Sequence, residues 1–300
     1  MNKKTLEIED LRNIKGFGKK MEERVLDYLI KKEKSTQQNK NMKNITTPLS
    51  MNVNTDDIYK GNSVEFMRKN IPDKSIDMVL TSPPYDNLRD YNGFQFDHEM
   101  MLDEIYRVLK DGGVCVWVVG DATIDGGETG SSFKHALYGK EIGFNLHDTM
   151  IYEKNTSSFP ASRNSNRYTQ IFEYMFVLSK GKPYVSNLIG EKKNKWAGHT
   201  NWGENTARGQ DGKLKDVGKI KEVPEYSPRN NIWKYVVGGG FASKDKIAYQ
   251  HPAIFPEKLA EDHILSWSNE GDIVLDPMCG SGTTCKMAKL NNRRFIGIDI

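Results

Sequence analysis

From Asp56 onward the sequence alternates short apolar runs with amphipathic stretches, and this alternation restricts the fold more than any other feature. Short apolar runs bounded by turn residues are typical of buried strands, whereas apolar residues at every third or fourth position indicate helices. The sequence predicts strands at 76–80, 114–119, 146–152, 173–178, 273–275 and 295–300, and helices at 100–109, 257–268 and 285–290. This order of elements indicates an α/β domain.

The first 33 residues precede this domain and have a different pattern. Residues 6–33 are predicted to form two short helices around a turn that contains Gly16 and Gly18. The stretch resembles a helix-hairpin-helix motif, in which such a turn directs backbone N–H groups at a DNA phosphate. The resemblance implies DNA binding by Lys15, Gly16, Gly18 and Lys19. The alternative is an amphipathic helical pair that only packs against the domain.

Residues 34–54 are rich in Lys, Asn, Gln, Ser and Thr and lack periodicity, so we expect a linker between residues 1–33 and a domain at 55–300. The net charge is only +3, but residues 1–44 carry +5 and residues 180–246 carry +7, which leaves −9 for the rest. Two basic segments on an acidic body suggest two places that hold a polyanion. Charge alone would fit solvated lysine-rich surfaces equally well.

The composition argues against several other classes of protein. No apolar run is long enough to span a bilayer, and the polar N-terminus does not resemble a secretory signal, so the expected location is the cytoplasm. Cys115, Cys279 and Cys285 form no CxxC pair and no zinc-ligand spacing. We therefore expect no metal site and no structural disulfide, and three buried thiols instead.

A glycine-containing segment, 276–284, separates the predicted strand at 273–275 from the helix that follows it. Glycine lets the backbone approach a ligand, and a helix start supplies free N–H groups. Asp299 follows Gly282 by seventeen residues, which is close to the spacing of a ribose-binding carboxylate. The phosphate-loop pattern GxxxxGK[ST] is absent, so the phosphate-free ligand S-adenosyl-L-methionine fits best. The predicted cofactor-binding residues of this motif are Asp276, Met278, Cys279, Gly280, Ser281, Gly282, Thr283, Thr284 and Asp299.

A second motif, Ser82-Pro83-Pro84-Tyr85, follows the predicted strand at 76–80. Two prolines hold the backbone extended and rigid. The hydroxyl of Ser82 and the carbonyl of Pro83 could then accept both hydrogens of an exocyclic amine, while Tyr85 stacks on the base. In isolation the same four residues would more often be a strand-ending turn with a packed aromatic ring.

Together the two motifs resemble those of the DNA amino-methyltransferases, which modify N4 of cytosine or N6 of adenine. Further matching segments lie at 71–77, 107–113, 230–233 and 251–259, and the resemblance covers residues 56–300. The tetrapeptide precedes the cofactor loop, which matches the circularly permuted order of the beta class. The resemblance implies a Rossmann-like S-adenosylmethionine-dependent methyltransferase fold with a target-recognition region at 182–246. It also implies that His251 and Phe255 help to cover the cofactor and that the last strand lies at a sheet edge.

The chain departs from the family pattern at one position, and it lacks the nucleophile that methylation of a base carbon requires. Family members often have Gly-Asp after the first strand, where this chain has Gly61-Asn62, which weakens the case for a contact of that position with the adenine ring. Methylation of cytosine C5 requires a Pro-Cys nucleophile, and each cysteine here follows a residue other than proline.

Catalytic roles are expected for Ser82, Pro83, Pro84 and Tyr85, with Ser at the first position favouring cytosine N4 over adenine N6. The expected partner is double-stranded DNA, contacted also by Arg163, Arg167, Trp196, His199 and Trp202. A cognate restriction endonuclease is a further candidate partner. Methylation of an RNA or protein amine remains an alternative reaction. A non-catalytic DNA-binding protein with a degenerate methyltransferase fold is the alternative from another class.

Overall fold

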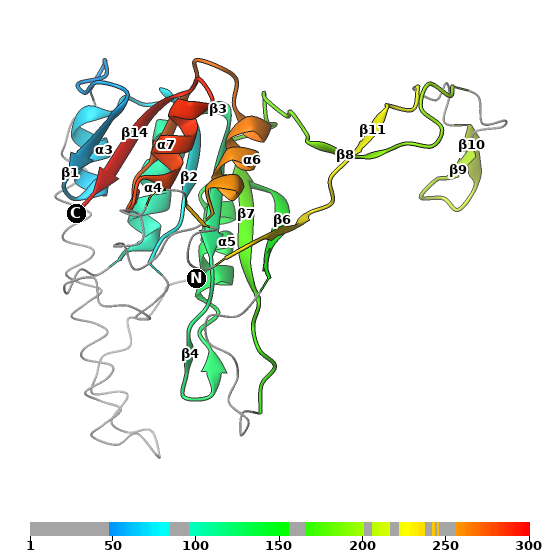
Figure 1. The fold of residues 1–300 in the computed structure, drawn as a ribbon, viewed down its shortest axis with the longest axis horizontal. Coiled ribbons are helices and arrows are strands. Elements are labelled where there is room, and N and C mark those ends of the chain that lie inside the picture. Colours follow the sequence, from blue (N-terminus) through cyan, green and yellow to red (C-terminus); the bar gives the residue numbers. More distant parts are fainter. Residues whose placement is uncertain are drawn as a thin grey trace, which may run out of the picture.

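The computed structural model describes residues 48–84, 96–155, 166–200, 206–216, 222–237, 242–243, 245 and 256–300. Within these residues, one sheet has the strand order β1-β14-β13-β2-β3-β7-β6-β12 (Figure 1). Its strands are β1 (Asp57–Lys60), β2 (Ile76–Thr81), β3 (Leu109–Val119), β6 (Asn145–Lys154), β7 (Phe172–Ser179), β12 (Ile232–Tyr235), β13 (Ile273–Asp276) and β14 (Arg294–Asp299). The helices are α3 (Ser63–Asn70), α4 (His98–Val108), α5 (Ser131–Glu141), α6 (Glu257–Trp267) and α7 (Thr283–Leu290). The predicted α/β class is confirmed.

The strand order reverses at the centre of the sheet, which is where open α/β sheets have a crevice for ligands. Strands β13 and β2 are parallel neighbours, but the chain continues from β13 to β14 on one side and from β2 to β3 on the other. Ligands of open α/β sheets bind at such a switch point, beyond the carboxyl ends of the strands. Both predicted motifs directly follow these two strands. The prediction that the last strand lies at an edge was wrong, because all four residues of β1 pair with residues 296–299 of β14.

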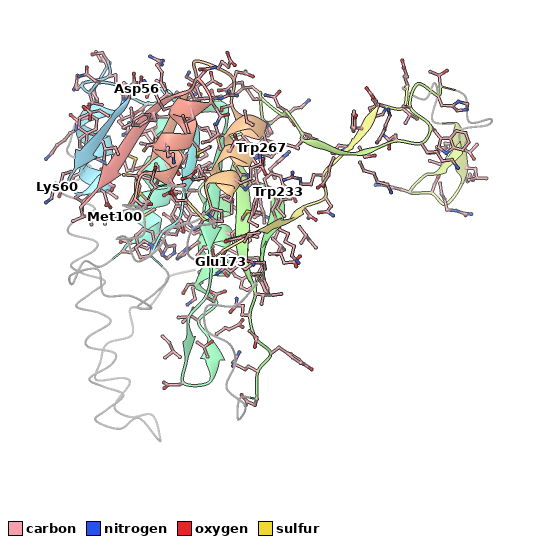
Figure 2. The ribbon with its side chains drawn as sticks, in the orientation of Figure 1. Asp56, Lys60, Met100, Glu173, Trp233 and Trp267 are labelled. Carbon is pink, nitrogen blue, oxygen red and sulfur yellow. The ribbon has the colours of Figure 1, made fainter. Side chains whose placement is uncertain are left out.

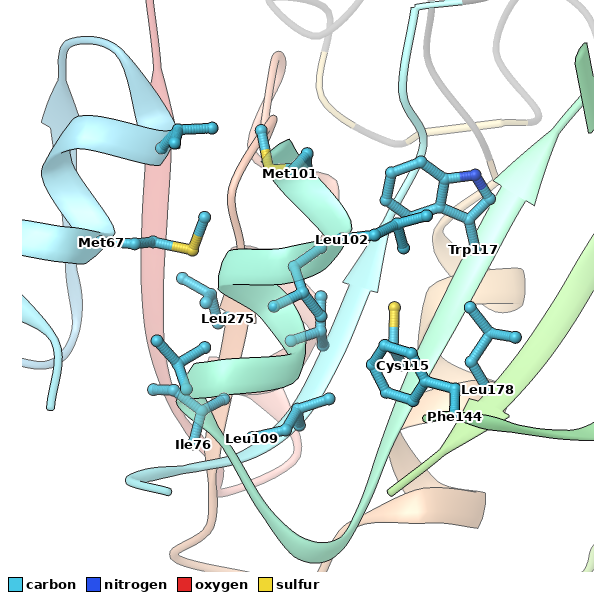
Figure 3. Close-up of a cluster of buried hydrophobic side chains, with 14 of the residues drawn as sticks. Met67, Ile76, Met101, Leu102, Leu109, Cys115, Trp117, Phe144, Leu178 and Leu275 are labelled. Atoms are coloured by element: carbon cyan, nitrogen blue, oxygen red, sulfur yellow. The ribbon is translucent and has the colours of Figure 1, made fainter. Parts of the chain in front are cut away.

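Helices cover both faces of the sheet, and the alternation of side chains along the strands explains why. In β3, Cys115 and Trp117 point to the face covered by α3, α4 and α5 (Figure 3), whereas Val114 and Val116 point to the face covered by α6 and α7. Successive residues of a strand face opposite sides, so a strand buried on both sides is apolar throughout. The sheet is therefore the rigid central layer from which the loops of the crevice emerge.

The sequence analysis placed a strand before Gly61 without giving its bounds and did not predict α3; β1 and α3 begin the domain. Asp56, just before β1, accepts hydrogen bonds from Lys289 Nζ at 2.8 Å and from the N–H of Phe295 at 3.2 Å, which ties this end of β1 to α7 and β14 (Figure 2). Asn62 ends the turn after β1 and caps α3 by accepting from the N–H of Glu65 at 3.1 Å. This capping role satisfies one of the free N–H groups of the first turn of α3.

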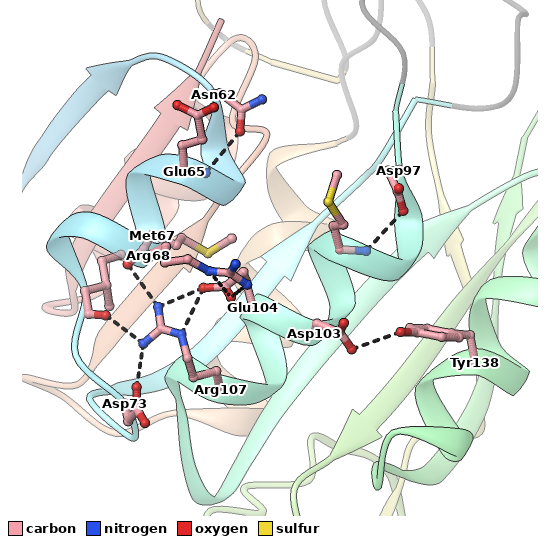
Figure 4. A network of polar contacts seen from close by, with 12 residues as sticks. Asn62, Glu65, Met67, Arg68, Asp73, Asp97, Asp103, Glu104, Arg107 and Tyr138 are labelled. Carbon is pink, nitrogen blue, oxygen red and sulfur yellow. Dashed lines mark hydrogen bonds and ion pairs between the residues drawn. The ribbon is translucent and has the colours of Figure 1, made fainter. Parts of the chain in front are cut away.

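Buried charges join α3 to α4 (Figure 4). Glu104 is 2% exposed and accepts from Arg68 Nε at 2.8 Å and from Arg107 Nε at 2.9 Å. Arg107 also donates to the Ile71 carbonyl at 2.9 Å and to Asp73 at 2.7 Å. Because two guanidinium groups depend on one buried carboxylate, the network fixes how α3 and α4 pack.

We expect Glu104→Gln to lower the free energy of unfolding by about 3 kcal/mol, because it removes the buried counter-charge of Arg68 and leaves Arg107 only the exposed Asp73. Urea unfolding at neutral pH measures this. The matched control is Glu65→Gln, which removes an exposed ion pair with Lys69 at 3.8 Å and should cost less than about 0.5 kcal/mol. Equal losses of unfolding free energy in the two variants would show that the buried network stabilises the fold no more than the exposed ion pair does.

The segment between β7 and β12 leaves the body as an arm (Figure 1). Its described residues form two antiparallel ribbons, β8 (Gly190–Lys193) with β11 (Tyr226–Pro228), and β9 (Thr206–Arg208) with β10 (Leu214–Asp216). The chain then returns to the main sheet through β12, which lies inside the predicted target-recognition region but pairs with β6. The sequence analysis also missed α5 and the small hairpin of β4 (Thr123–Ile124) and β5 (Gly127–Glu128).

The base of the arm is attached to α6 by a buried carboxylate. Asp262 is 1% exposed and accepts from Arg229 at 2.9 Å and from the hydroxyl of Tyr235 at 2.8 Å. The guanidinium of Arg229 also lies over the ring of Trp233, 5.2 Å from its centroid. The arm therefore leaves the body at a defined position. Within the described part of the chain, no helix is both long and apolar enough to cross a membrane.

Candidate active site

The glycine segment forms a tight turn between β13 and α7. Gly280 and Gly282 have positive φ angles of 47° and 77°, which are accessible to glycine at little cost. The N–H of Gly282 donates to the Cys279 carbonyl at 2.7 Å, and the N–H of Cys279 donates to the Ile298 carbonyl at 3.0 Å. The turn is thus folded onto the end of β14. Gly282 is the N-cap of α7 and has no side chain, so the first turn of α7 has free N–H groups to offer a ligand.

Four parallel strands end beside this turn. In the register of the sheet Asp299, at the end of β14, lies opposite Lys60, at the end of β1, and the Asp299 carbonyl accepts from the N–H of Gly61 at 2.8 Å. Ser63, at the start of α3, donates its hydroxyl to the Pro277 carbonyl of the turn. Asp299 keeps a half-buried carboxylate at this edge. The edge combines a carboxylate acceptor with free backbone donors, which suits a ligand with ribose hydroxyls and amino groups.

Strand β2 precedes the tetrapeptide, and its last residue, Thr81, joins it to the glycine segment. Thr81 donates its hydroxyl to Asp276 Oδ1 at 2.8 Å, and both side chains are almost fully buried. Ser82 and Pro84 follow and are half-buried, whereas Pro83 is buried. The fold therefore brings Ser82–Pro84 next to the start of the predicted cofactor loop, although the two segments are almost 200 residues apart in the chain. Tyr85 lies outside the described residues.

Comparison with known proteins agrees with this geometry. A family described as DNA methylase, which comprises N6- and N4-specific enzymes, matches residues 76–300. The chain belongs to this family. The orphan methyltransferase M.BamHII of Bacillus amyloliquefaciens is 59% identical to it over 234 residues, which cover 78% of this chain and 87% of the relative. Two longer relatives are spanned by this chain over about two thirds of their length.

Solved structures show the same fold as this DNA methylase. The PvuII DNA methyltransferase, described as cytosine-N4-specific, has a TM-score of 0.58 and 19% identity, with 86% of each chain covered. A DNA modification methylase from Thermus thermophilus, solved with S-adenosyl-L-methionine, has a TM-score of 0.51 and 23% identity, with 81% of this chain and 88% of that chain covered. The expected Rossmann-like fold is confirmed. S-adenosyl-L-methionine is the methyl donor of this family, as the sequence predicted.

Gly297 is one of the residues of the methylase site that the sequence analysis missed. It lies in the middle of β14 under the glycine turn, and a Cβ atom there would lie 2.7 Å from Cys285 Sγ, 3.0 Å from Ile58 Cγ1 and 3.1 Å from Cys279 Sγ. Atoms cannot approach this closely without moving, so only glycine allows the turn to sit on β14. The single local signal for this position is a glycine flanked by two isoleucines within a strand, which often marks a close backbone approach.

The three thiols of the methylase are buried, as predicted. Burial raises the pKa of Cys115. A hydrogen bond with Cys279, together with burial, raises the pKa of Cys285. Thiols with a raised pKa are poor nucleophiles, so Cys115 and Cys285 are packing residues.

Three of the predicted DNA-binding residues, Arg167, Trp196 and His199, lie in the described part of the chain, and their contacts with DNA stay predictions. Arg167 donates to the Gly126 carbonyl and lies 3.6 Å from a carboxylate oxygen of Glu128, so it holds the β4–β5 hairpin. Trp196 is 52% exposed on the arm, with the ring of His199 at 5.8 Å. The other predicted positions lie outside the described residues: Lys15, Gly16, Gly18, Lys19, Arg163, Trp202, His251 and Phe255.

The buried carboxyl group of Asp276 has a raised pKa. Burial raises its pKa from 3.8 to about 6, although hydrogen bonds from Thr284, Thr81 and the N–H of Met278 lower it. The folded state therefore holds this proton more tightly than the unfolded state does. The protein consequently loses stability as the pH rises from about 4 to about 6, and the loss is constant above that range.

We expect this loss to be about 3 kcal/mol, because one pKa unit corresponds to about 1.4 kcal/mol. Asp276→Asn has no such proton to lose. The unfolding free energy of the variant, minus that of the natural protein, should rise by up to about 3 kcal/mol between pH 4 and pH 8. Denaturant titrations at both pH values measure the difference, and a value that does not change with pH would contradict the assignment.

Proposed function

We propose that the protein transfers a methyl group from S-adenosyl-L-methionine to N4 of cytosine in double-stranded DNA. The observation that carries the proposal is the hydrogen bond between Thr81 and Asp276, because it puts Ser82–Pro84 beside the cofactor loop. A site for direct methyl transfer must hold the acceptor amine within reach of the donor carbon, and two loops at one switch point can hold both.

Each element of the site has a separate task in this proposal. The carboxylate of Asp299 accepts hydrogen bonds from the ribose hydroxyls, and the turn at 280–282 with the start of α7 holds the rest of the cofactor. The bound cofactor supplies an electrophilic methyl carbon. Ser82 Oγ and the Pro83 carbonyl accept the two amine hydrogens, which turns the nitrogen lone pair away from the ring. These acceptors also stabilise the positive charge that grows on nitrogen.

The base must leave the duplex to reach this crevice, at a cost of a few kcal/mol. Tyr85, which follows Pro84 directly, is proposed to stack on the extruded base. The arm is proposed to contact the duplex, and its base is held on α6 by Asp262. His251 and Phe255 are proposed to cover the cofactor, and residues 1–33 to bind a DNA phosphate. The domain boundaries at 33 and 54, and the cytoplasm as the location, belong to the same proposal.

The choice of cytosine N4 rests on Ser82 as the first residue of the tetrapeptide and on the structural likeness to an enzyme described as cytosine-N4-specific. Adenine N6 is the alternative, since a relative from Escherichia coli (strain K12) is named a DNA adenine methyltransferase. A restriction endonuclease is not part of the proposal, because the 59% identical relative is named an orphan methyltransferase.

Purified protein, tritiated S-adenosyl-L-methionine and bacteriophage DNA test the proposal in one reaction. We expect label in DNA that migrates as N4-methyl-2′-deoxycytidine after digestion to nucleosides. Ser82→Ala should reduce the rate at least about tenfold, since it removes one acceptor from the transition state. The matched control is Ser50→Ala, which changes an exposed serine before β1 and should leave the rate unchanged. Label in N6-methyladenine would favour the alternative base, and DNA binding without any label would indicate a non-catalytic protein.

A further inference from the structure

The end of β2 and the end of β13 share one buried carboxylate oxygen. Oδ1 of Asp276 accepts from Thr81 Oγ1 at 2.8 Å and from the N–H of Met278 at 3.2 Å. Thr81 is fully buried and Asp276 is 2% exposed, so no solvent replaces these donors. The same atom therefore bonds to the residue before Ser82 and to the backbone of the cofactor loop.

A third element, α7, also contacts the carboxylate of Asp276. The hydroxyl of Thr284, in the first turn of α7, lies 3.4 Å from the Leu80 carbonyl and also within hydrogen-bonding reach of Asp276, so these two acceptors share its single hydrogen. The other ionisable groups that act on Asp276 are Asp299 of β14, Cys115 of β3 and Cys285 of α7. Asp276 is thus held by hydroxyl and amide donors from three elements that border the crevice.

Such a cluster is costly for the fold. A buried carboxylate loses its hydration, and apolar side chains of similar volume at the same place would often be at least as stable. Core stability therefore does not explain why a charged group joins these strands. What the hydrogen bonds provide, and an apolar contact does not, is a fixed direction and distance between two loops.

We propose that Thr81 and Asp276 are positioning residues, which set the distance between the amine acceptors at Ser82–Pro83 and the methyl donor in the cofactor loop. This inference rests on the proposed function. Neither side chain touches the reacting atoms in this account; both act through the loops that follow them. In-line transfer is sensitive to such placement, and a misplacement of about 1 Å can reduce the rate about a hundredfold.

Thr81→Val and Thr81→Ser form the matched pair that tests the inference. Valine keeps the shape of threonine and removes the donor, whereas serine keeps the donor. We expect kcat to fall between about 10-fold and 100-fold for Thr81→Val, with KM for S-adenosyl-L-methionine and for DNA within about threefold of the natural values. Thr81→Ser should stay within about threefold in all three constants. Circular dichroism gives the folded fraction, to which each kcat is normalised.

A purely structural role would give a different result: the midpoint of unfolding would fall, but kcat of the folded fraction would not. Natural kcat in Thr81→Val, or equal losses in the valine and serine variants, would overturn the proposal. Thr81→Ala replaces Thr81→Val in the same comparison if the valine variant yields too little folded protein. An inactive natural protein would contradict the proposed function itself, which separates the two failures.

A double-mutant cycle asks whether the two residues act together. Asp276→Asn keeps the volume and an acceptor oxygen, although a neutral amide is a weaker acceptor than a carboxylate. The combined variant should lose less than the product of the two single losses, because Thr81→Val has already removed the contact that the two residues share. Losses that multiply would show that the two residues act independently, and would also overturn the proposal.

Discussion

Gly297→Ala is expected to weaken the binding of S-adenosyl-L-methionine between about 5-fold and 150-fold. The added methyl group would enter the space of Cys279 Sγ and Cys285 Sγ, at 3.1 and 2.7 Å, and would push the glycine turn off β14. Overpacking of this kind costs about 1–3 kcal/mol, which corresponds to that range of dissociation constants. Isothermal titration calorimetry with the cofactor measures the change.

Two further variants show whether steric contact is the cause. Gly127→Ala places a methyl group where the nearest atom lies 3.8 Å away, so binding should not change. Adding Cys285→Ala to Gly297→Ala removes the sulfur that makes the shortest contact and should recover part of the affinity. Unchanged binding in Gly297→Ala would mean that the turn adapts, and that its close approach to β14 is not needed for the cofactor.

Removal of residues 195–224, the outer part of the arm, is expected to reduce the rate of DNA methylation more than a hundredfold. The dissociation constant for the cofactor should stay within about threefold. Residues 195–224 can be replaced by a short glycine-serine turn, because the N–H of Asn194 donates to the Glu225 carbonyl at 2.8 Å and the two ends already lie together. The deleted segment contains six lysine or arginine residues together with Trp196, His199 and Trp202. Neutralised phosphates and stacked bases would be lost with it.

The salt dependence of DNA affinity is a second measurement that tests this prediction. Each lost phosphate contact lowers the slope of log affinity against log salt by about 0.9. We therefore expect a shallower slope for the shortened protein, measured between about 50 and 200 mM salt. Equal rates and slopes for the full and shortened proteins would show that the arm does not contact DNA.

The sequence predicted the strands around the crevice because each is a nearly continuous apolar run bounded by turn residues. The predicted strand 76–80 and the helix 257–268 differ from β2 and α6 by one residue each. Helix α5 was missed because its apolar pattern is weak, with Phe133 and Leu137 exposed on one side. Strand β12 was missed because it is four residues long and follows a polar arm.

The two motifs of the site were predictable because glycine and proline mark them locally. Thr81, Ser63 and Gly297 were not, since their importance comes from contacts with residues far away in the chain. Thr81 bonds to a residue 195 positions away, and Ser63 bonds to one 214 positions away. No local pattern contains such a contact. The contact of Asp276 with the cofactor stays a prediction, and nothing in the sequence indicated that its carboxylate accepts from Thr81.

A crystal structure with S-adenosyl-L-homocysteine tests most directly whether the glycine turn and the tetrapeptide form one site. We predict that the ribose lies on Asp299, that the ligand follows the turn at 280–282, and that its sulfur faces Ser82–Pro84 across the crevice between β13 and β2. A ligand bound elsewhere, or Ser82 and Asp299 lining separate clefts, would contradict the account.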